Sequence, residues 1–377
     1  MIQSVFARND AGMKECRLPS DVFILLPFLI LFLFLTIVRP EKLIRYPDLV
    51  DWNTLAALAG LLIITTSIKE SGYFRAIAAE ILERMGDERK LAIYLVLLSC
   101  LLSSFLTNDI ALFIIVPLTL SLQEIMKKDV GKLVIFEAMA VNVGSLLTPI
   151  GNPQNLFLWH HWGLTFLGFI AEMLPLFLLL FMLLLFFIMM AFPSKRIDFH
   201  RGEERKYSRR MFFLSLLILA AYVFSLRMGW EYYALAAVIF IYLSFSRRTF
   251  IEMDWFLLLL LLIMFIDFRL LTEMDAIHAI MSGIDTANPS GIFILSASLS
   301  QMMSNVPASI FVAEISHQWK AIAYGVNVGG NGLVIASLAN IIALRLARDA
   351  KIWLQFHKYS IPYFLISSVM AYLIFFR

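Results

Sequence analysis

Charge and cysteine are both scarce in this chain. Only 16% of its 377 residues are charged, whereas soluble domains average about 25%. Cys16 and Cys100 are its two cysteines, which are too few for a disulfide framework. The 12 prolines are scattered, and the formal net charge is only +3. These shortages exclude a disordered protein, a collagen-like protein and a nucleic-acid binder that works through a basic surface.

Apolar residues are abundant instead. They make up 60% of the chain, including 33 Phe, which is more than one aqueous core can bury. They form a series of uncharged runs, and a membrane-spanning helix needs about 20 such residues. The first run, 22–38, lacks a small-residue cleavage site and is interpreted as an uncleaved anchor. The composition predicts an all-α polytopic membrane protein with about nine full spans.

Lys and Arg in the loops predict the orientation, because cytoplasmic loops carry an excess of both. The linker 193–210 is strongly basic, so we place it in the cytoplasm. Counting crossings from this linker puts the tail 1–19 in the cytoplasm and the C-terminus in the periplasm. Arg39, Lys42 and Arg45 then fall on the outer side, against the rule.

Several sequence patterns recur in the same order in the two halves of the chain. Val-Asn-Val-Gly at 141–144 returns at 326–329, and Asn155 returns as Asn340, both with an offset of 185. Two looser matches are Ser103 with Thr107-Asn108 against Ser300 with Ser304-Asn305, and Asp51-Trp52 against Asp254-Trp255. An odd number of predicted crossings separates the copies, so the second copy is inverted relative to the first. Inverted repeats are typical of secondary transporters.

Polar or glycine-rich residues interrupt four of the apolar segments. Two segments are predicted re-entrant hairpins: 91–124, with its tip at Thr107-Asn108-Asp109, and 289–314, with its tip at Ser304-Asn305. Two others, 133–160 and 320–346, are predicted broken helices. Irregular backbone at membrane depth is tolerated only where it is buried in protein or lines a wet cavity. We therefore assign the first repeat to 20–192 and the second to 211–377, joined by the cytoplasmic linker.

Four motifs in these segments resemble those of a known family of membrane proteins. They are Thr-Asn-Asp-Ile-Ala-Leu at 107–112 with Val-Pro-Leu at 116–118, Thr-Pro-Ile-Gly-Asn-Pro-Gln-Asn at 148–155, Ser-Asn-Val-Pro at 304–307, and Gly-Gly-Asn at 329–331 with Ser-Leu-Ala-Asn at 337–340. With them the chain resembles the ion transporter superfamily of arsenite exporters, sodium/proton antiporters, citrate transporters and sodium–dicarboxylate symporters. It is most similar to the citrate-transporter-like branch of bacterial inner-membrane proteins.

The resemblance implies a scaffold and a mobile transport domain that work as an elevator in a homodimer of the bacterial inner membrane. It implies secondary active transport of a small anion or oxyanion, citrate-like, dicarboxylate-like or another, coupled to Na⁺ or H⁺. The expected partners are this substrate, the coupling ion and membrane lipid. No nucleic acid, no cofactor and no metal beyond Na⁺ are expected.

Candidate site residues follow from the tips and the repeated asparagines. The substrate is expected at Thr107, Asn108, Asp109, Ser304, Asn305, Val306, Asn142 and Asn327. The resemblance implies that Ser103, Thr107, Asn108 and Gly151 line a first cation site, and that Ser300, Ser304, Asn305 and a carbonyl near Ala336 line a second. The internal repeat adds Asn155 and Asn340 as candidate cation ligands.

Two acidic residues have open interpretations. Asp109 either binds the coupling cation or proton, or caps a half-helix that starts at Ile110. Asp267 is either a second proton site or the ion-pair partner of Arg269. The repeated asparagines, similarly, either line the site or join helices by hydrogen bonds.

Competing functions also remain open. The dicarboxylate branch has Ser-Asn-Thr at both tips, and Asp109 puts a negative charge where a carboxylate would dock. That charge suits a sodium/proton antiporter or an arsenite-type exporter better. An intramembrane enzyme is disfavoured because the spans contain no Gly-x-Ser-x-Gly or His-Glu-x-x-His motif. Glu137 and Glu172 are expected near span ends, in contact with water. The sequence selects neither Na⁺ nor H⁺, and neither uptake nor efflux.

Overall fold

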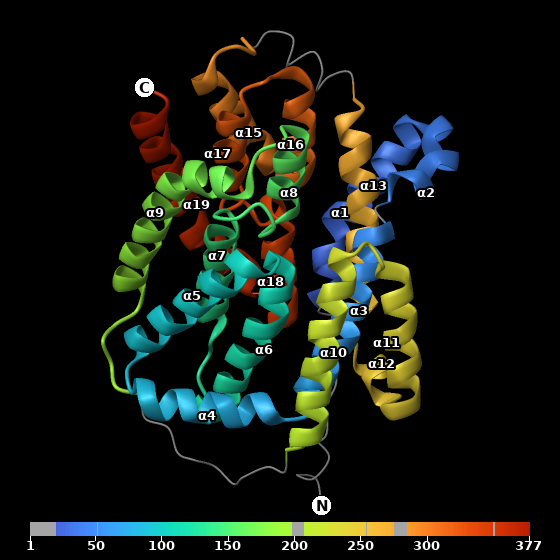
Figure 1. The fold of residues 1–377 in the computed structure, drawn as a ribbon, viewed down its shortest axis with the longest axis vertical. Helices are drawn as coiled ribbons and strands as arrows, with labels where there is room; N and C mark the ends of the chain where they lie inside the picture. The colour runs from blue at the N-terminus through green and yellow to red at the C-terminus, as the bar shows by residue number, and fades with distance from the viewer. Residues whose placement is uncertain (1–19, 51, 198–206, 254, 275–284, 350) are drawn as a thin grey trace, which may run out of the picture.

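The computed structural model describes residues 20–50, 52–197, 207–253, 255–274, 285–349 and 351–377 (Figure 1). Over these ranges the chain is helical and forms no β-strand, apart from an isolated bridge between Asp87 and Arg196. By length and composition, α6 (Asn108–Met126), α9 (Phe166–Ala191), α10 (Arg209–Arg227) and α19 (Lys351–Phe375) can each span a membrane. The prediction of an all-α polytopic membrane protein is confirmed. The tail 1–19, Asp51, Asp254 and the central part of the basic linker lie outside the described residues.

One group of helices, here called the frame body, forms one side of the molecule (Figure 1). Its central helix, α3 (Trp52–Glu70), contacts α10, α11 (Glu231–Phe245), α12 (Arg248–Glu252) and α13 (Trp255–Thr272). Helix α13 also contacts α1 (Ser20–Val38) and α2 (Tyr46–Leu49), which the 3₁₀ helix η2 (Pro40–Arg45) connects.

Hydrogen bonds join the frame helices where apolar packing alone gives little preference over lipid. The Tyr242 hydroxyl donates to Ser215 Oγ (2.8 Å), which lies 3.0 Å from Ser67 Oγ, so α11, α10 and α3 share one chain of hydroxyls. The Tyr222 hydroxyl of α10 donates to the Ala56 carbonyl of α3 (3.0 Å). These contacts fix the register of the three helices.

Arg39 and Lys42, two of the basic residues that lie on the predicted outer side against the charge rule, bind Glu273. Arg39 donates to the Glu273 carbonyl (2.9 Å), and Lys42 Nζ donates to the Glu273 carboxylate (2.8 Å). The Lys42 hydrogen bond holds the pKa of the Glu273 carboxyl below its usual range. These residues therefore bind the segment after α1 to the end of α13.

The second group, here called the hairpin body, contains the segments that the sequence marks as interrupted. Its members are α5 (Glu88–Phe105), α6, α7 (Gly131–Ser145), α8 (Pro153–His161), α9, α15 (Pro289–Met303), α16 (Asn305–Ile315), α17 (Trp319–Gly329), the 3₁₀ helix η3 (Val334–Ala336), α18 (Leu338–Ala347) and α19. Helix α4 (Tyr73–Met85) runs along one end of the molecule and leads from the frame body into α5 (Figure 1).

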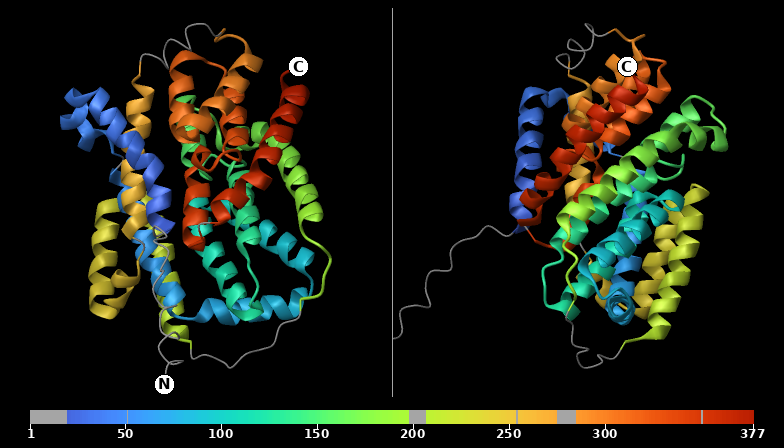
Figure 2. Two further views of the ribbon diagram at one scale, coloured as in Figure 1. Left: turned by 180° about the vertical axis from the view of Figure 1, so that it is seen from behind. Right: turned by 90° about the vertical axis from the view of Figure 1, so that its left-hand side faces the viewer.

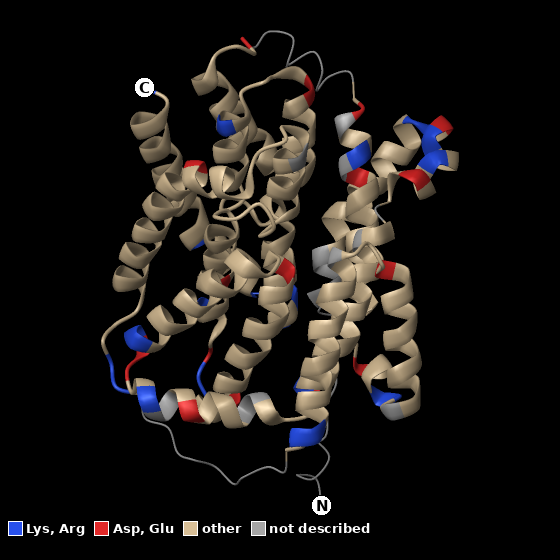
Figure 3. Cartoon of the chain, viewed as in Figure 1, with Lys and Arg blue, Asp and Glu red and all other residues tan. Residues whose placement is uncertain are grey.

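The two bodies are distinct but touching, as the view from behind in Figure 2 shows. Helix α3 contacts α6, and α13 contacts α15 and α16. Charged residues lie mainly toward helix ends: α10 and α11 carry them only at their ends, whereas α4 carries several along one end of the molecule (Figure 3).

Helices break at each of the four predicted polar segments. Helix α5 ends at Phe105 and α6 starts at Asn108, and α15 and α16 meet at Ser304, whose φ is +69°. Helix α7 ends at Ser145 and α8 starts at Pro153. Proline suits this first helical position, because the N–H that it lacks would have no partner within the helix. The segment 330–337 separates α17 from α18 in the same way.

The halves of the chain are packed across each other. Helix α8 lies against α16, and α18 lies against α6, so the second part of each broken helix contacts the hairpin of the other half (Figure 1). Helices α5 and α15 enter the hairpin body from opposite ends of the molecule (Figure 1).

Two glycines permit the close approach of helices within each half. A Cβ at Gly144 of α7 would lie 2.3 Å from the Cys100 carbonyl oxygen and from Ser103 Oγ of α5. Gly329, which is 185 residues later, has the same role in α17: its Cβ would lie 2.7 Å from Ser300 Cβ of α15.

Gly144→Ala should therefore destabilise the protein. The added methyl group meets backbone atoms that cannot move cheaply, and overpacking of this kind costs about 1–3 kcal/mol. We expect the thermal unfolding midpoint in detergent, followed by tryptophan fluorescence, to fall by several degrees. Gly291→Ala is the matched control, because its Cβ has 3.9 Å of clearance and should leave the midpoint unchanged. Equal midpoints for the two variants would contradict the close approach.

Candidate functional site

Two asparagine pairs join the halves of the chain at the broken helices. Asn142 Nδ2 of α7 donates to Asn340 Oδ1 of α18, and Asn327 Nδ2 of α17 donates to Asn155 Oδ1 of α8, both at 2.8 Å. All four side chains are buried. Each residue of one pair lies 185 positions from its counterpart in the other pair, which is the offset found in the sequence.

The contacts around these pairs follow the same offset. Ser337 Oγ donates to Asn142 Oδ1 (3.0 Å), and Asn152 Nδ2, 185 positions earlier, donates to Asn327 Oδ1 (3.1 Å). The Asn155 amide donates to the carbonyls of residues 145 and 148, and the Asn340 amide to those of residues 330 and 333. Here the asparagine amides serve as hydrogen-bond connections between helices, one of the two roles expected of them.

The first hairpin tip is fastened to the broken helix of its own half. The Asn108 backbone N–H donates to the Gly151 carbonyl (2.8 Å), and Thr148 Oγ1 donates to the Ser104 carbonyl (2.7 Å). The structure thus brings together Asn108 and Gly151 of the first candidate cation site. Ser103 is buried against Gly144 and donates to the Cys100 carbonyl (3.2 Å), which leaves its oxygen lone pairs available.

Asp109 does not cap a half-helix at Ile110. Helix α6 begins two residues earlier, at Asn108, and it is Asn108 Oδ1 that accepts the Asp109 N–H (2.9 Å). The Asp109 carboxylate is buried, and its Oδ1 accepts no hydrogen bond from any residue in the described ranges. The capping interpretation is therefore wrong. The carboxylate sits in the first turn of a helix, where its charge is favoured by the helix dipole.

The second tip has a strained residue at its turn. Ser304 has a positive φ that residues with a Cβ rarely adopt, and such strain gathers at binding and switch sites. Asn305 is buried beside Gly330, since a Cβ there would lie 3.0 Å from Asn305 Nδ2. Val306 is partly buried and Ala336 fully buried.

Gln301, which belongs to none of the sequence motifs, joins the second hairpin to the broken helix of its own half. Its Nε2 donates to the Gly329 carbonyl and its Oε1 accepts the Leu333 N–H, both at 2.8 Å. Ser300, one residue earlier, donates to the Ser296 carbonyl (2.8 Å) and is likewise buried.

Asp267 lies in α13 of the frame body. It is fully buried, and neither carboxylate oxygen accepts a hydrogen bond within the described part of the chain. Pairing with Arg269, one of the two interpretations of Asp267, is therefore wrong. Residues two apart in a helix point in different directions, which is the physical reason.

Glu137 was expected near a span end and is instead fully buried in α7. It accepts a short hydrogen bond from Thr119 Oγ1 of α6, and its Oε2 has no partner among the described residues. An isolated carboxylate in an otherwise apolar segment is the sequence signal that marks it. Glu172, by contrast, is half exposed and forms an ion pair with Lys320 (2.6 Å).

Further buried acceptor oxygens surround the asparagine pairs. Gln154 Oε1 and Asn331 Oδ1 have no hydrogen-bond donor within the described ranges, like Asp109 Oδ1. Each of the three belongs to a residue next in sequence to a residue of the pairs, the breaks or the tips: Asn155, Gly330 and Asn108 respectively. Oxygen acceptors without donors suit a hard cation such as Na⁺, or a proton on the carboxylate. No group of three His, Cys, Asp or Glu side chains that could hold a metal occurs in these same ranges.

A double-mutant cycle tests whether the asparagines connect the halves. Asn327→Ala and Asn155→Ala should each lower the unfolding free energy in SDS titrations, and the double variant should lose less than their sum. Hydrogen bonds between membrane helices give coupling of about 0.6 kcal/mol and at most about 1.7 kcal/mol. The control cycle pairs Asn327→Ala with Gln318→Ala, an exposed side chain bonded to the Ala287 carbonyl, and should be additive. Additivity in both cycles would refute the connection.

Comparison with known proteins adds independent information. A family model described as citrate transporter matches residues 11–318. The inner membrane protein YbiR of Escherichia coli is 40% identical over 330 residues, which cover 87% of this chain and 89% of that protein. The transporter MJ0456 of Methanocaldococcus jannaschii is 34% identical over 335 residues, covering 87% and 90%. The transporter Rv2684 of Mycobacterium tuberculosis is 25% identical over 350 residues, covering 82% of each chain.

Proposed function

The chain belongs to the citrate transporter family and is a membrane transporter, not an enzyme, and on this premise we propose that the two hairpin tips form its transport site. The proposed activity is secondary active transport of a small anion or oxyanion, citrate-like or dicarboxylate-like, driven by Na⁺ or H⁺. The observation that carries the proposal is the buried asparagine connection between the two broken helices.

The connection supports one composite site instead of two separate ones. Asn108 is bonded to Gly151, and Asn305 lies against Gly330, so each tip is held to the broken helix of its own half. The broken helices are in turn held to each other by the asparagine pairs. The tips therefore belong to one continuous structure.

Helix ends supply the electrostatics that such a site needs. Helices α6 and α16 begin at the tips, and α8 and α18 begin after the breaks, so their N-termini favour an anion there. Helices α5, α7, α15 and α17 end at the same tips and breaks, and the negative ends of their dipoles favour a cation. The arrangement suits an anion and a coupling cation bound close together.

Two observations support the proposed inverted repeat of 20–192 and 211–377. The hydrogen bonds repeat with the 185-residue offset of the sequence. The hairpins also enter from opposite ends of the molecule (Figure 1). We propose that the hairpin body is the moving part of an elevator and the frame body its scaffold, since the main contacts between the bodies are those of α3 and α13 with the hairpins. The basic linker places the N-terminus in the cytoplasm in this proposal.

Asp109 is the proposed coupling residue. Its buried Oδ1 has no donor among the residues that the structure describes, and the hydroxyl oxygens of Ser103 and Ser300 keep lone pairs for a cation. An ionised Asp109 would repel an anionic substrate, so a proton or Na⁺ must neutralise it first. The same oxygens support a second candidate function, sodium/proton antiport or arsenite-type export, in which no anion binds.

Asn108→Ala and Asn305→Ala should each abolish transport. Both side chains are buried at the tips, so their removal strips polar groups from the site and little apolar packing from the fold. The assay is uptake of radiolabelled citrate, with succinate and arsenite in parallel, into proteoliposomes with imposed Na⁺ or pH gradients. Asn288→Ala, an exposed helix cap, is the control and should transport normally. Normal transport by either tip variant would remove the tips from the site.

Asp109→Asn should uncouple transport while preserving the fold. The amide keeps the shape of the side chain but cannot titrate, so the dependence of uptake on Na⁺ or pH should disappear together with most of the rate. The measurement is initial uptake rate against pH and against Na⁺ concentration, for wild type and variant. A variant with unchanged rate and unchanged dependence on both ions would show that Asp109 takes no part in coupling.

A further inference from the structure

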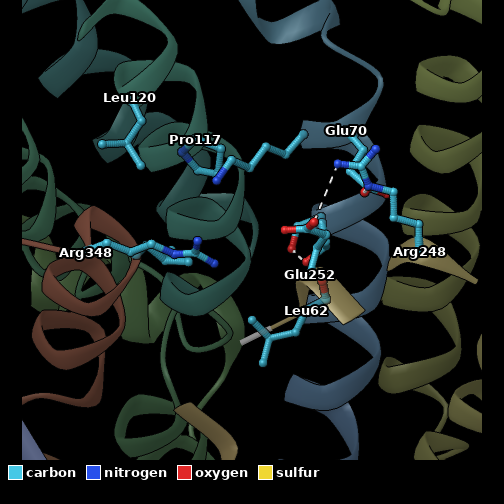
Figure 4. A pocket seen from close by; sticks show the side chains of 11 residues that line it. Leu62, Glu70, Pro117, Leu120, Arg248, Glu252 and Arg348 are labelled. Carbon is cyan, nitrogen blue, oxygen red and sulfur yellow. Dashed lines mark hydrogen bonds and ion pairs between the residues drawn. The ribbon is translucent and has the colours of Figure 1, made fainter. Parts of the chain in front are cut away.

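A cleft of about 200 Å³, lined by both charged and apolar side chains, lies where the two bodies meet (Figure 4). Its walls are α3 and α12 of the frame body, and α6 with the end of α18 of the hairpin body. Pro117 on its α6 wall is nine residues from Asn108, or about 14 Å along the helix. The cleft is therefore separate from the hairpin tips.

Charges of both signs line the cleft, with positive charge in excess. Lys69, Arg248 and Arg348 stand against Glu70 and Glu252, which leaves a net charge of +1. On the frame wall both carboxylates pair with the same cation: Arg248 Nε lies 3.3 Å from Glu70 and Nη2 lies 3.6 Å from Glu252, so Arg248 compensates one of the two negative charges.

The other two cations have no such partner. Neither Lys69 nor Arg348 forms an ion pair or a side-chain hydrogen bond with any residue that the structure describes. The Arg348 side chain extends from the end of α18 into the gap that faces Leu62 and Glu252 (Figure 4). The positive charges of Lys69 and Arg348 repel each other, and Glu124 and Glu252 attract Lys69 only from a distance.

Two local features prepare the cleft for a ligand. Arg348 has φ of +55°, so the chain turns sharply after α18, in a conformation that residues with a Cβ rarely adopt. This turn places the guanidinium at the cleft. Thr66, on the α3 wall, has a hydroxyl without a hydrogen bond to any described residue. The space is far larger than one water molecule requires.

We propose that the cleft binds an oxyanion of the phosphate type between Lys69 and Arg348, with the Thr66 hydroxyl as a further donor. A guanidinium presents planar N–H groups that match phosphate oxygens, and a lysine adds a point charge. The phosphate group can be free in solution or belong to an anionic lipid headgroup. Because the ligand would touch α3 and α18 together, it would connect the frame body to the hairpin body. The proposed site is independent of substrate transport at the tips.

Inorganic phosphate is the probe for this site. The purified protein in detergent is titrated with sodium phosphate against sodium chloride of equal ionic strength, and the thermal unfolding midpoint is recorded. Phosphate should raise the midpoint of the wild type in a saturable manner. Lys69→Gln and Arg348→Gln should each weaken the apparent affinity about tenfold, the loss expected for one charge-assisted hydrogen bond. Lys69→Arg, which keeps the charge, should retain binding.

Lys351→Gln is the matched control, because Lys351 is exposed beyond α18 and lies outside the cleft lining. It should leave phosphate binding unchanged. No specific effect of phosphate on the wild type, or an equal loss in all three glutamine variants, would overturn the proposal. Repeating the titration in nanodiscs identifies the source: phosphatidylglycerol should abolish the phosphate response if headgroups fill the cleft, and phosphatidylcholine should leave it intact.

Discussion

The buried asparagine pairs are the interaction on which the hairpin body depends. Breaking a helix at membrane depth frees carbonyls and N–H groups that lipid cannot satisfy. Asn155 and Asn340 meet part of this need, because their amides donate to carbonyls of the breaks at residues 145 and 330. Their side-chain oxygens also accept the amide of the partner asparagine from the other half. One side chain thus stabilises a break and joins the two halves.

The limited number of amide donors explains why some oxygen acceptors near the breaks and tips have no hydrogen bond from the described residues. The amide donors are used within the protein, whereas Asp109, Gln154 and Asn331 each retain a buried oxygen without a donor in the described ranges. Burying a polar atom without a partner is costly, so these oxygens are suited to bind a ligand. A cation or proton at these oxygens, and an anion at the helix N-termini, would together complete the polar interactions of the proposed site.

The sequence predicted the places where helices break, because Gly, Pro and Asn in apolar segments have strong local effects. It also predicted which residues correspond between the halves. It could not predict that Asn142 bonds Asn340 and not Asn327, because that pairing depends on how the halves cross. Glu137 was placed near a span end because its burial depends on α6 packing over it; its isolation in an apolar segment was the one local signal of that burial. Asp267 does not pair with Arg269 because residues two apart in a helix point in different directions. Their spacing was already visible in the sequence.

A structure determined with substrate and coupling ion bound tests the central claim most directly. The account predicts density for the anion between Asn108 and Asn305, with a cation or a protonated carboxylate at Asp109. Substrate bound elsewhere, with both hairpin tips unchanged and remote from it, would contradict the composite site.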